Sequence, residues 1–521
     1  MKNLFKKIYN SKWFIVVLIF FGITARMVEY FINHTLWLDE AGLAITIIKL
    51  NYLELLKPLP YYGLVEPVIF VLVVKFFTKL WGYSEFIFRL FPLITGLGTL
   101  ALSYPLGKNF LKTKAIPVFI CLFAFSRFGI YYSREARQYS LELFVSVLLV
   151  LFSIYVFKSK FNIKKIIFLG IIGIFSIWCS YTSIFVLAGL GLALILEFII
   201  DRKKYNYKSL ISLLIIGFIW IINFFLDYFL IIKAERAGYS SVYWLNYFAP
   251  FPPKNLMELW WYPKNFFYVL NNPLGLTFYL NNPRNIPYFL IVFQYIIVIS
   301  LIIFGTYSLW KDRKRFFLFI IYFPLIVLFI FTILKIYPIW GRLVLFILPM
   351  FYLLIAEGAI KLLEVFSKKI KYVGKSFGII IIVLFLIYPA GYSLLNMIKP
   401  EIKPESRNET KPAIEYYFSH RKPSDKVYIF PAPFDDPVYL YYTQYYFKDM
   451  GQKILINSKI EENKEEYFSE LKNNMKNNKV WIIFPSNTKP EKEILDFLNT
   501  IGQKKDEFSA TATIYCYDFK K

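Results

Sequence analysis

The sequence of 521 residues is poor in the side chains that build disulfide frameworks and metal clusters. Its three cysteines, Cys121, Cys179 and Cys516, lie far apart, and its two histidines are His34 and His420. The cysteine spacing fits neither a disulfide framework nor a thiolate metal site. Two histidines do not make a His-rich metal cluster or a proton relay.

Acidic residues are also scarce, with 35 Asp+Glu against 60 Lys+Arg and a formal net charge of +25. A nucleic-acid-binding protein of this charge concentrates it on a soluble face. This chain is instead 57% hydrophobic and 21% aromatic, with a mean hydropathy of +0.50. Its uncharged runs are long enough to cross a bilayer. The composition predicts an integral membrane protein that contacts membrane lipids and binds no nucleic acid.

The positions of Lys and Arg between the apolar runs predict the topology, because short loops rich in these residues stay in the cytoplasm. Six such loops hold 24 Lys+Arg and three acids, which is +21 of the net charge. They are the N-terminus and residues 108–114, 158–165, 201–208, 311–315 and 361–375. Placing all six inside gives about 11 spans, at residues 13–32, 87–107, 115–131, 139–157, 166–181, 183–200, 209–232, 287–310, 316–334, 342–362 and 376–396.

Two details of this arrangement rest on length and charge. The uncharged stretch 166–196 is too long for one untilted helix, so it is divided near residues 180–183. Residues 66–81 could cross, but crossing would move the loop 108–114 outside. They are therefore expected to form a helix at the outer interface, within an external loop of residues 33–86.

The composition changes after residue 396. Residues 397–521 hold 20 Lys+Arg and 19 Asp+Glu, and the strand-like runs KVYIF, KVWIIF and TATIYCY alternate with a helical stretch, KEEYFSELKNNMKN. We expect a transmembrane domain of residues 1–396 followed by a small soluble α/β domain of residues 397–521 outside the cell. The N-terminus is expected in the cytoplasm of a multi-pass plasma-membrane protein.

Acids at span ends are candidates for function, because charge near a membrane must be solvated, paired or in use. Three groups fall on the external side: Trp37-Leu38-Asp39-Glu40, Glu66-Pro67, and YYSREARQYSLE at residues 131–142. Asp39 could equally be a helix N-cap, and Glu66 a solvated loop acid. The third group has two arginines and two glutamates in nine residues, which must pair or bind a ligand.

LWLDEAG, VEPVIFVLVVKFFTKLWGYSEFIFRLFP and YYSREARQYSLELF resemble, in this order, the GT-C class of membrane glycosyltransferases, which take sugar from a polyprenyl-phosphate carrier. The nearest branches are the protein O-mannosyltransferases and the lipid A aminoarabinose transferase. The resemblance covers about the first 200 residues, is diffuse through the middle spans and recurs at YPIWGRLVLFILP. It implies a GT-C-like helical membrane fold with interfacial helices in the first external loop.

The resemblance places the family's first-loop acid on Asp39, with Glu40 beside it, and the Glu that precedes Pro on Glu66. The Arg and acid five residues apart fall on Arg137 and Glu142, with the Tyr displaced to Tyr139. Both branches tend to carry a Lys after the Glu or Pro to hold phosphate. Val68 and Ile69 stand there in this chain, so the phosphate contact is expected elsewhere.

The residue types fit this chemistry. Asp39 is the predicted catalytic base for the acceptor hydroxyl. The leaving lipid phosphate needs fixed cations, for which Arg137, Arg134 and Arg342 are suited, although Arg342 could instead be an interfacial anchor beside Tyr337 and Trp340. The remaining substrate-binding candidates are Glu40, Glu66, Glu135, Tyr139 and Glu142. A divalent metal ion is left open, and its ligands would be Asp39, Glu66 and Glu142.

The sequence thus predicts an inverting glycosyltransferase that moves a sugar from a polyprenyl-phosphate donor to an acceptor hydroxyl on protein, lipid or glycan, outside the membrane. The alternative is a transporter or flippase of lipid-linked sugars. That class usually has a two-fold repeat and charges near the midplane, whereas here no repeat is visible and the acids gather at one face. A structural receptor is a third class, but it needs far fewer spans. The aromatic segment 233–287 is either an interfacial belt or a cover over the carrier site.

Overall fold

The computed structural model describes residues 12–158, 163–200, 207–237, 244–277, 288–312, 314–369, 410–430, 437–446, 452–454, 456, 460, 462–484, 491–509 and 512–520. The chain forms two compact units. The first comprises Met1–Phe31, Asn51–Gly82 and Phe86–Ile402, and the second comprises Ile32–Leu50, Tyr83–Glu85 and Lys403–Lys521. The expected eleventh span, residues 376–396, lies outside the described residues.

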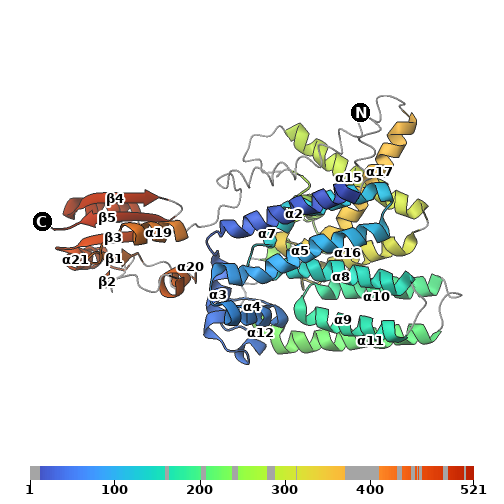
Figure 1. Cartoon of the computed structure of the whole chain (residues 1–521), viewed down its shortest axis with the longest axis horizontal. Helices are drawn as coiled ribbons and strands as arrows, with labels where there is room; N and C mark the ends of the chain where they lie inside the picture. The colour runs from blue at the N-terminus through green and yellow to red at the C-terminus, as the bar shows by residue number, and fades with distance from the viewer. Residues whose placement is uncertain are drawn as a thin grey trace. The chain divides into compact units, whose positions relative to one another are not determined.

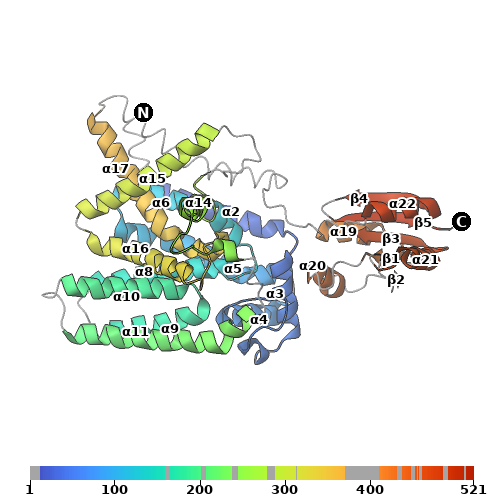
Figure 2. The ribbon, with the colours of Figure 1, turned by 180° about the vertical axis from the view of Figure 1, so that it is seen from behind.

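The first unit is helical (Figures 1 and 2). Eight of its described helical stretches are long and apolar enough to cross a membrane. Within it, α10 packs on α16, α9 on α11, and α15 on α17. The main helices are α2 (Lys12–Ile32), α4 (Val68–Trp81), α5 (Glu85–Phe110), α6 (Ile116–Ala124), α7 (Arg127–Tyr132), α8 (Tyr139–Lys158), α9 (Ile163–Cys179), α10 (Ser183–Ile200), α11 (Tyr207–Asp227), α12 (Lys233–Ala237), α14 (Leu256–Asn271), α15 (Tyr288–Lys311), α16 (Arg315–Ile333) and α17 (Leu348–Lys369).

Several sequence-based boundaries are confirmed. The expected division near residues 180–183 is the turn between α9 and α10, and the helix expected over residues 66–81 is α4. The span expected at 342–362 begins as a 3-10 helix, Gly341–Ile347, and continues as α17. Apolar runs and the Ser/Thr residues between them therefore give helix positions to within a few residues.

The single helix expected over residues 115–131 is wrong. Two short helices, α6 and α7, stand there, with a break at Phe125 and Ser126. The Arg26 guanidinium of α2, which is 1% exposed, donates to the carbonyls of Phe123 and Ala124 at 3.0 and 3.3 Å. Ser126 accepts from the amide of Gly129 at 3.1 Å and caps α7. Backbone groups freed by the break thus find polar partners, as a helix interrupted within an apolar bundle requires.

Two of the six basic loops meet at one end of the first unit. The ammonium of Lys112, between α5 and α6, lies 3.1 Å from the carboxylate of Asp312, and Lys314 donates to the Phe110 carbonyl at 3.0 Å. Lys112 also pairs with Glu357, whose side chain is fully buried. Burial lowers the pKa of Lys112, but its two carboxylate partners outweigh burial and leave the pKa raised. Loops 108–114 and 311–315 therefore lie on the same side of the bundle.

Helices α15 and α17 approach closely because glycines face each other's backbone. A Cβ on Gly305 would lie 2.0 Å from the Leu354 carbonyl oxygen, and one on Gly358 would lie 1.9 Å from the Leu301 carbonyl oxygen. Small residues allow such approach between helices in membranes. No side chain larger than hydrogen fits at either position without moving a helix.

The second unit contains a five-stranded sheet, drawn in red and orange in Figure 1, with strand order β2-β1-β3-β5-β4. Strand β1 is parallel to β2 and β3, whereas β5 is antiparallel to β3 and β4. The strands are β1 (Lys426–Ile429), β2 (Gln452–Ile454), β3 (Lys479–Phe484), β4 (Gln503–Ser509) and β5 (Thr513–Asp518); the helices are α19 (Lys411–His420), α20 (Pro437–Leu440), α21 (Lys464–Met475) and α22 (Glu491–Ile501). The three strand-like runs and the helical stretch are thus confirmed.

The central strand β3 is buried on both faces, which explains its continuous apolar sequence. Val480, Ile482 and Phe484 join the core formed with α21 and α22. On the other face, Trp481 contacts Tyr417 of α19 at 5.8 Å between ring centroids and donates to Asp425 at 3.0 Å. The sheet therefore has helices on both faces.

Candidate functional site

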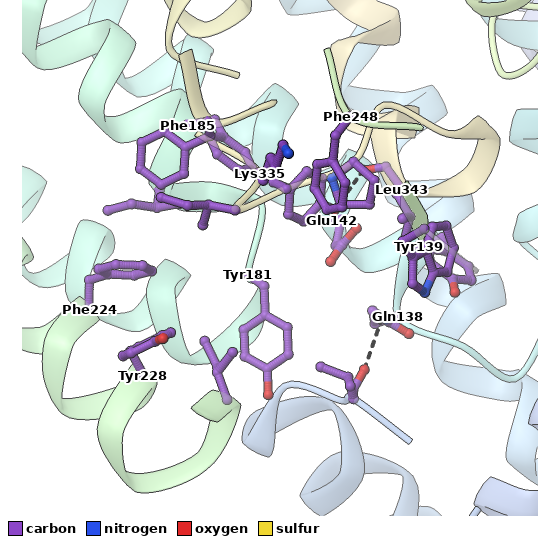
Figure 3. A pocket seen from close by; sticks show the side chains of 18 of the residues that line it. Gln138, Tyr139, Glu142, Tyr181, Phe185, Phe224, Tyr228, Phe248, Lys335 and Leu343 are labelled. Carbon is purple, nitrogen blue, oxygen red and sulfur yellow. Dashed lines mark hydrogen bonds between the residues drawn. The ribbon is translucent and has the colours of Figure 1, made fainter. Parts of the chain in front are cut away.

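The site begins with the loop between α7 and α8, which carries the arginine-rich motif, and with Glu66, just before α4. Arg137 pairs with Glu66 through Nε and Oε1 at 2.8 Å, and the two side chains are 6% and 0% exposed. The Gln138 amide nitrogen donates to the Val65 carbonyl at 3.3 Å (Figure 3); with the amide reversed, it donates to Glu66 at 2.7 Å. Glu66 is therefore part of a buried ion pair, and its expected alternative as a solvated loop acid is wrong.

A cavity of about 350 Å³ lies beside this ion pair, within the first unit (Figure 3). We call it the aromatic cavity. Glu142 and Lys335 carry the charged groups in its wall besides Arg137. Its aromatic and aliphatic lining is Val65, Tyr139, Tyr181, Ile184, Phe185, Phe224, Tyr228, Ile232, Trp244, Leu245, Phe248, Phe331, Ile336, Tyr337, Pro338 and Leu343. A mostly apolar pocket with a few convergent polar groups is typical of a ligand site.

Tyr181 links the ion pair to a second buried acid. Its hydroxyl donates to the Glu66 carbonyl at 2.7 Å and lies 3.4 Å from the carboxylate of Glu235. Glu235 in turn accepts from the Leu59 amide at 3.2 Å and is 4% exposed. These contacts hold the loop before α4 against the turn before α10 and against α12, so the position of Glu66 is fixed from several directions.

Tyr139, at the start of α8, lines the cavity and contacts two arginines, Arg137 and Arg342. The Arg137 and Arg342 guanidinium carbons lie 5.8 and 5.4 Å from the centre of its ring, within the range of a cation–π contact. Arg342 is the second residue of the 3-10 helix that follows Trp340. Glu66, Arg137, Tyr139, Glu142 and Arg342, all expected from the sequence, are therefore brought together.

Arg134 and Glu135 lie elsewhere. Arg134 pairs with Glu29 of α2 at 3.2 Å and lies over the Tyr131 ring at 4.5 Å. Glu135 is 1% exposed, and neither residue is among those that line the aromatic cavity. Within this motif, Arg137 therefore lines the cavity and Arg134 contacts the end of α2.

Asp39 and Glu40 belong to the second unit, in the first turn of α3 (Leu38–Lys49). The helix begins at Leu38 with Trp37 as the cap residue, so the alternative of Asp39 as N-cap is wrong. Glu40 reaches back to accept from the Trp37 amide at 3.2 Å and is buried, whereas Asp39 is partly exposed. Both acids favour the helix start electrostatically.

The described residues contain no group of three His, Cys, Asp or Glu side chains that could hold a metal ion. Of the three acids that the sequence allowed as metal ligands, Glu66 is paired with Arg137 and Glu142 lines the aromatic cavity. Asp39 lies in the other unit.

The aromatic segment of residues 233–287 contributes directly to the cavity. Trp244, Leu245 and Phe248 are in its wall, and Tyr268 of α14 stacks on Trp340 with ring centroids 4.6 Å apart. Part of the segment therefore lies in the cavity wall, as a cover over the carrier site requires. Residues 238–243 and 278–287 of this segment lie outside the described residues.

Four functional candidates were missed from the sequence. Tyr181 and Lys335 come from turns and Glu235 from the short helix α12, in separate regions of the chain and without a local motif. Asp227 is different: it is 1% exposed, and neither of its carboxylate oxygens has a hydrogen-bond partner among the described residues. A lone acid inside the apolar run 209–232 was a visible signal.

No protein-family model matches this chain, and no curated protein matches it. Among solved structures, it is similar to ArnT from Cupriavidus metallidurans in the apo state, with 12% identity over 95% of this chain and 97% of that chain and a TM-score of 0.47. It is also similar to the archaeal oligosaccharyltransferase AglB from Archaeoglobus fulgidus, in complex with an inhibitory peptide and a dolichol-phosphate, with 13% identity over 98% and 74% and a TM-score of 0.48. A second structure of ArnT, bound to undecaprenyl phosphate, gives 12% identity and a TM-score of 0.36.

Proposed function

We propose that this protein is an inverting glycosyltransferase that moves a sugar from a polyprenyl-phosphate donor to an acceptor hydroxyl. The observation that carries the proposal is the aromatic cavity, where Arg137, held by Glu66, meets the carboxylate of Glu142 among aromatic side chains. Such a cavity suits a ligand with an anionic group, a polar ring and an apolar chain. The motifs shared with GT-C enzymes support the same ligand class.

In the proposed reaction, the acceptor oxygen forms a bond to the anomeric carbon while the bond from that carbon to the phosphate oxygen breaks. Attack from the face opposite the phosphate inverts the anomeric centre. Asp39 takes the acceptor proton as general base. The lipid phosphate leaves as a stable anion and needs no general acid, unlike the alkoxide that glycosidases protonate.

Fixed cations stabilise the phosphate as its charge grows. Arg137 in the cavity wall and Arg342, beside Tyr139 of that wall, are suited to this by their forked guanidinium groups. Lys335 also lines the cavity and is exposed. It can hold the phosphate in place of the Lys that the related branches carry where this chain has Val68 and Ile69. Arg134, paired with Glu29, orders the motif and has no direct contact with phosphate in this scheme.

The carboxylates have separate proposed roles. Glu142 binds sugar hydroxyls within the cavity, and Glu66 orients Arg137. Glu40 holds the start of α3, and Glu135 supports the motif from its buried position. A divalent ion would require oxygen ligands contributed on substrate binding. Metal dependence is tested by adding EDTA, which should abolish transfer, and then excess Mg²⁺ or Mn²⁺, which should restore it.

We further propose that transfer takes place on the extracytoplasmic face of the plasma membrane. Loops 108–114 and 311–315 share one end of the bundle, which supports a common cytoplasmic side for the basic loops. Cysteine labelling with a membrane-impermeant reagent tests this: a cysteine at Lys492 should react in intact cells, and one at Lys314 should not.

Replacing Asp39 with asparagine tests the reaction itself. Transfer should be lost while expression and binding of undecaprenyl phosphate are kept, because the change removes the base and leaves the cavity intact. Glu54→Gln, at another acid of the first external loop, is the matched control and should transfer normally. Near-normal turnover in Asp39→Asn would remove Asp39 from the base role.

A further inference from the structure

Glu85 is a buried junction of three segments that are distant in the sequence. It is 1% exposed and is the first residue of α5. Its Oε2 accepts from the Lys411 ammonium at 2.5 Å and from the Asn33 amide at 2.8 Å. Its Oε1 accepts a hydrogen bond from the hydroxyl of Tyr442. Within the second unit, one carboxylate therefore joins Asn33 to two elements of the C-terminal α/β domain.

The same junction fixes the backbone that leads into α3. The Tyr442 hydroxyl, besides donating to Glu85, accepts from the Leu36 amide at 2.8 Å, and the Lys411 amide donates to the Thr35 hydroxyl at 3.3 Å. Leu36 and Tyr442 are fully buried. Helix α3 then packs on α20 and on the π-helical turn Tyr441–Tyr446. Residues 33–50 are thus part of the C-terminal unit by contact.

The charges at this junction are matched. Burial lowers the pKa of Lys411, but the neighbouring Glu85 carboxylate outweighs burial, so the pKa is raised and the ammonium stays charged at neutral pH. A buried pair whose carboxylate accepts two further hydrogen bonds holds its groups in one arrangement, since breaking it leaves an uncompensated buried charge. The contact between residues 33–50 and the C-terminal α/β domain is therefore fixed by side chains.

We infer that the C-terminal domain positions the helix that carries Asp39, and that Glu85 and Lys411 are the positioning residues. This rests on the proposed function, because Asp39 acts there as the base. Asp39 stands one residue after the start of α3, four residues from Thr35. Displacing a catalytic group by about 1 Å can lower a rate about 10²-fold. The domain would thus be needed for turnover even without touching donor or acceptor.

The test compares Glu85→Gln and Lys411→Met with the conservative variant Lys411→Arg in the full-length protein. Glu507→Gln, which breaks the exposed pair with Lys504 in strand β4, is the matched control. The transfer product is quantified by mass spectrometry in cells complemented with each variant at equal expression. Undecaprenyl phosphate binding is measured on purified protein, and hydrogen exchange is followed in α3 and in the sheet.

We expect Glu85→Gln and Lys411→Met to lower product about 10²-fold and to speed exchange in α3, with exchange in the sheet and undecaprenyl phosphate affinity unchanged. Lys411→Arg should restore most of the product. Faster exchange in α3 with normal product would overturn the inference, and so would lost product with α3 exchange unchanged. If Glu85→Gln unfolds, Tyr442→Phe removes the two hydrogen bonds of the Tyr442 hydroxyl, to Glu85 and from the Leu36 amide, keeps the Glu85–Lys411 pair, and must give the same pattern in milder form. If the wild-type protein makes no transfer product, the proposed function is wrong. The hydrogen-exchange data still decide, in that case, whether Glu85 holds α3 in place.

Discussion

Replacing Glu66 with glutamine tests the buried ion pair on which the aromatic cavity depends. The Glu66 and Arg137 side chains are 0% and 6% exposed, with Nε and Oε1 2.8 Å apart. At an effective dielectric constant of about 20, that separation corresponds to a gross attraction of about 6 kcal/mol. Desolvation of both groups offsets part of this attraction. Removing one partner of such a pair nonetheless costs about 3 to 5 kcal/mol, because the other charge stays buried without compensation.

The free energy of unfolding is measured in detergent by denaturant titration for Glu66→Gln, Arg137→Met and the double variant. We expect each single change to destabilise by about 3 to 5 kcal/mol and the double variant to cost less than their sum. The exposed pair Lys464–Glu493, whose side chains are 62% and 47% exposed, is the control and should couple by at most about 1 kcal/mol. Equal coupling energies in the two pairs would refute the reasoning from burial.

Three further predictions concern packing and charge. Gly305→Ala should destabilise the bundle by about 1 to 3 kcal/mol in thermal unfolding, because its Cβ would overlap the Leu354 carbonyl, whereas Gly191→Ala, with open space around it, should not destabilise. Lys335→Gln should weaken binding of undecaprenyl phosphate about 10-fold without changing stability, and unchanged affinity would exclude Lys335 from the phosphate site. Glu357→Gln should lower the unfolding free energy by about 1 to 3 kcal/mol, since it removes a buried carboxylate partner of Lys112; a neutral result would mean that Asp312 alone holds this lysine.

The fold could be predicted from the sequence wherever a segment determines its own structure. The apolar runs, the Ser/Thr turn between α9 and α10, and the three strand-like runs correspond to elements of the structure. The break between α6 and α7 could not be predicted, because Arg26, which hydrogen-bonds the carbonyls at the break, lies about 100 residues away. The polar strand β4, QKKDEFS, also lacked a signal, since only its pairing with β5 makes it a strand.

In the candidate site, too, residues with a local signal could be predicted, whereas residues that join through tertiary contacts could not. Arg137 and Glu142 could be found from a dense charged motif, and Glu66 from a short resemblance. Lys335, Tyr181 and Glu235 join them through tertiary contacts alone, which spacing in the sequence does not encode. Residues 33–50 precede the second span in the sequence and are expected in the transmembrane domain, while contacts group them with the C-terminal unit.

Transfer by purified protein in detergent tests the central claim most directly. A micelle does not separate two compartments, so a transporter or flippase has nothing to move a lipid across and forms no product there. The donor is the pool of lipid-linked sugars extracted from cells that lack this protein, and the acceptor is their envelope fraction. We predict that wild-type protein releases polyprenyl phosphate and labels the acceptor, and that Arg137→Lys slows both about 10²-fold or more. Recovery of the lipid-linked sugars intact in detergent, with their movement across the bilayer in proteoliposomes, would contradict the account.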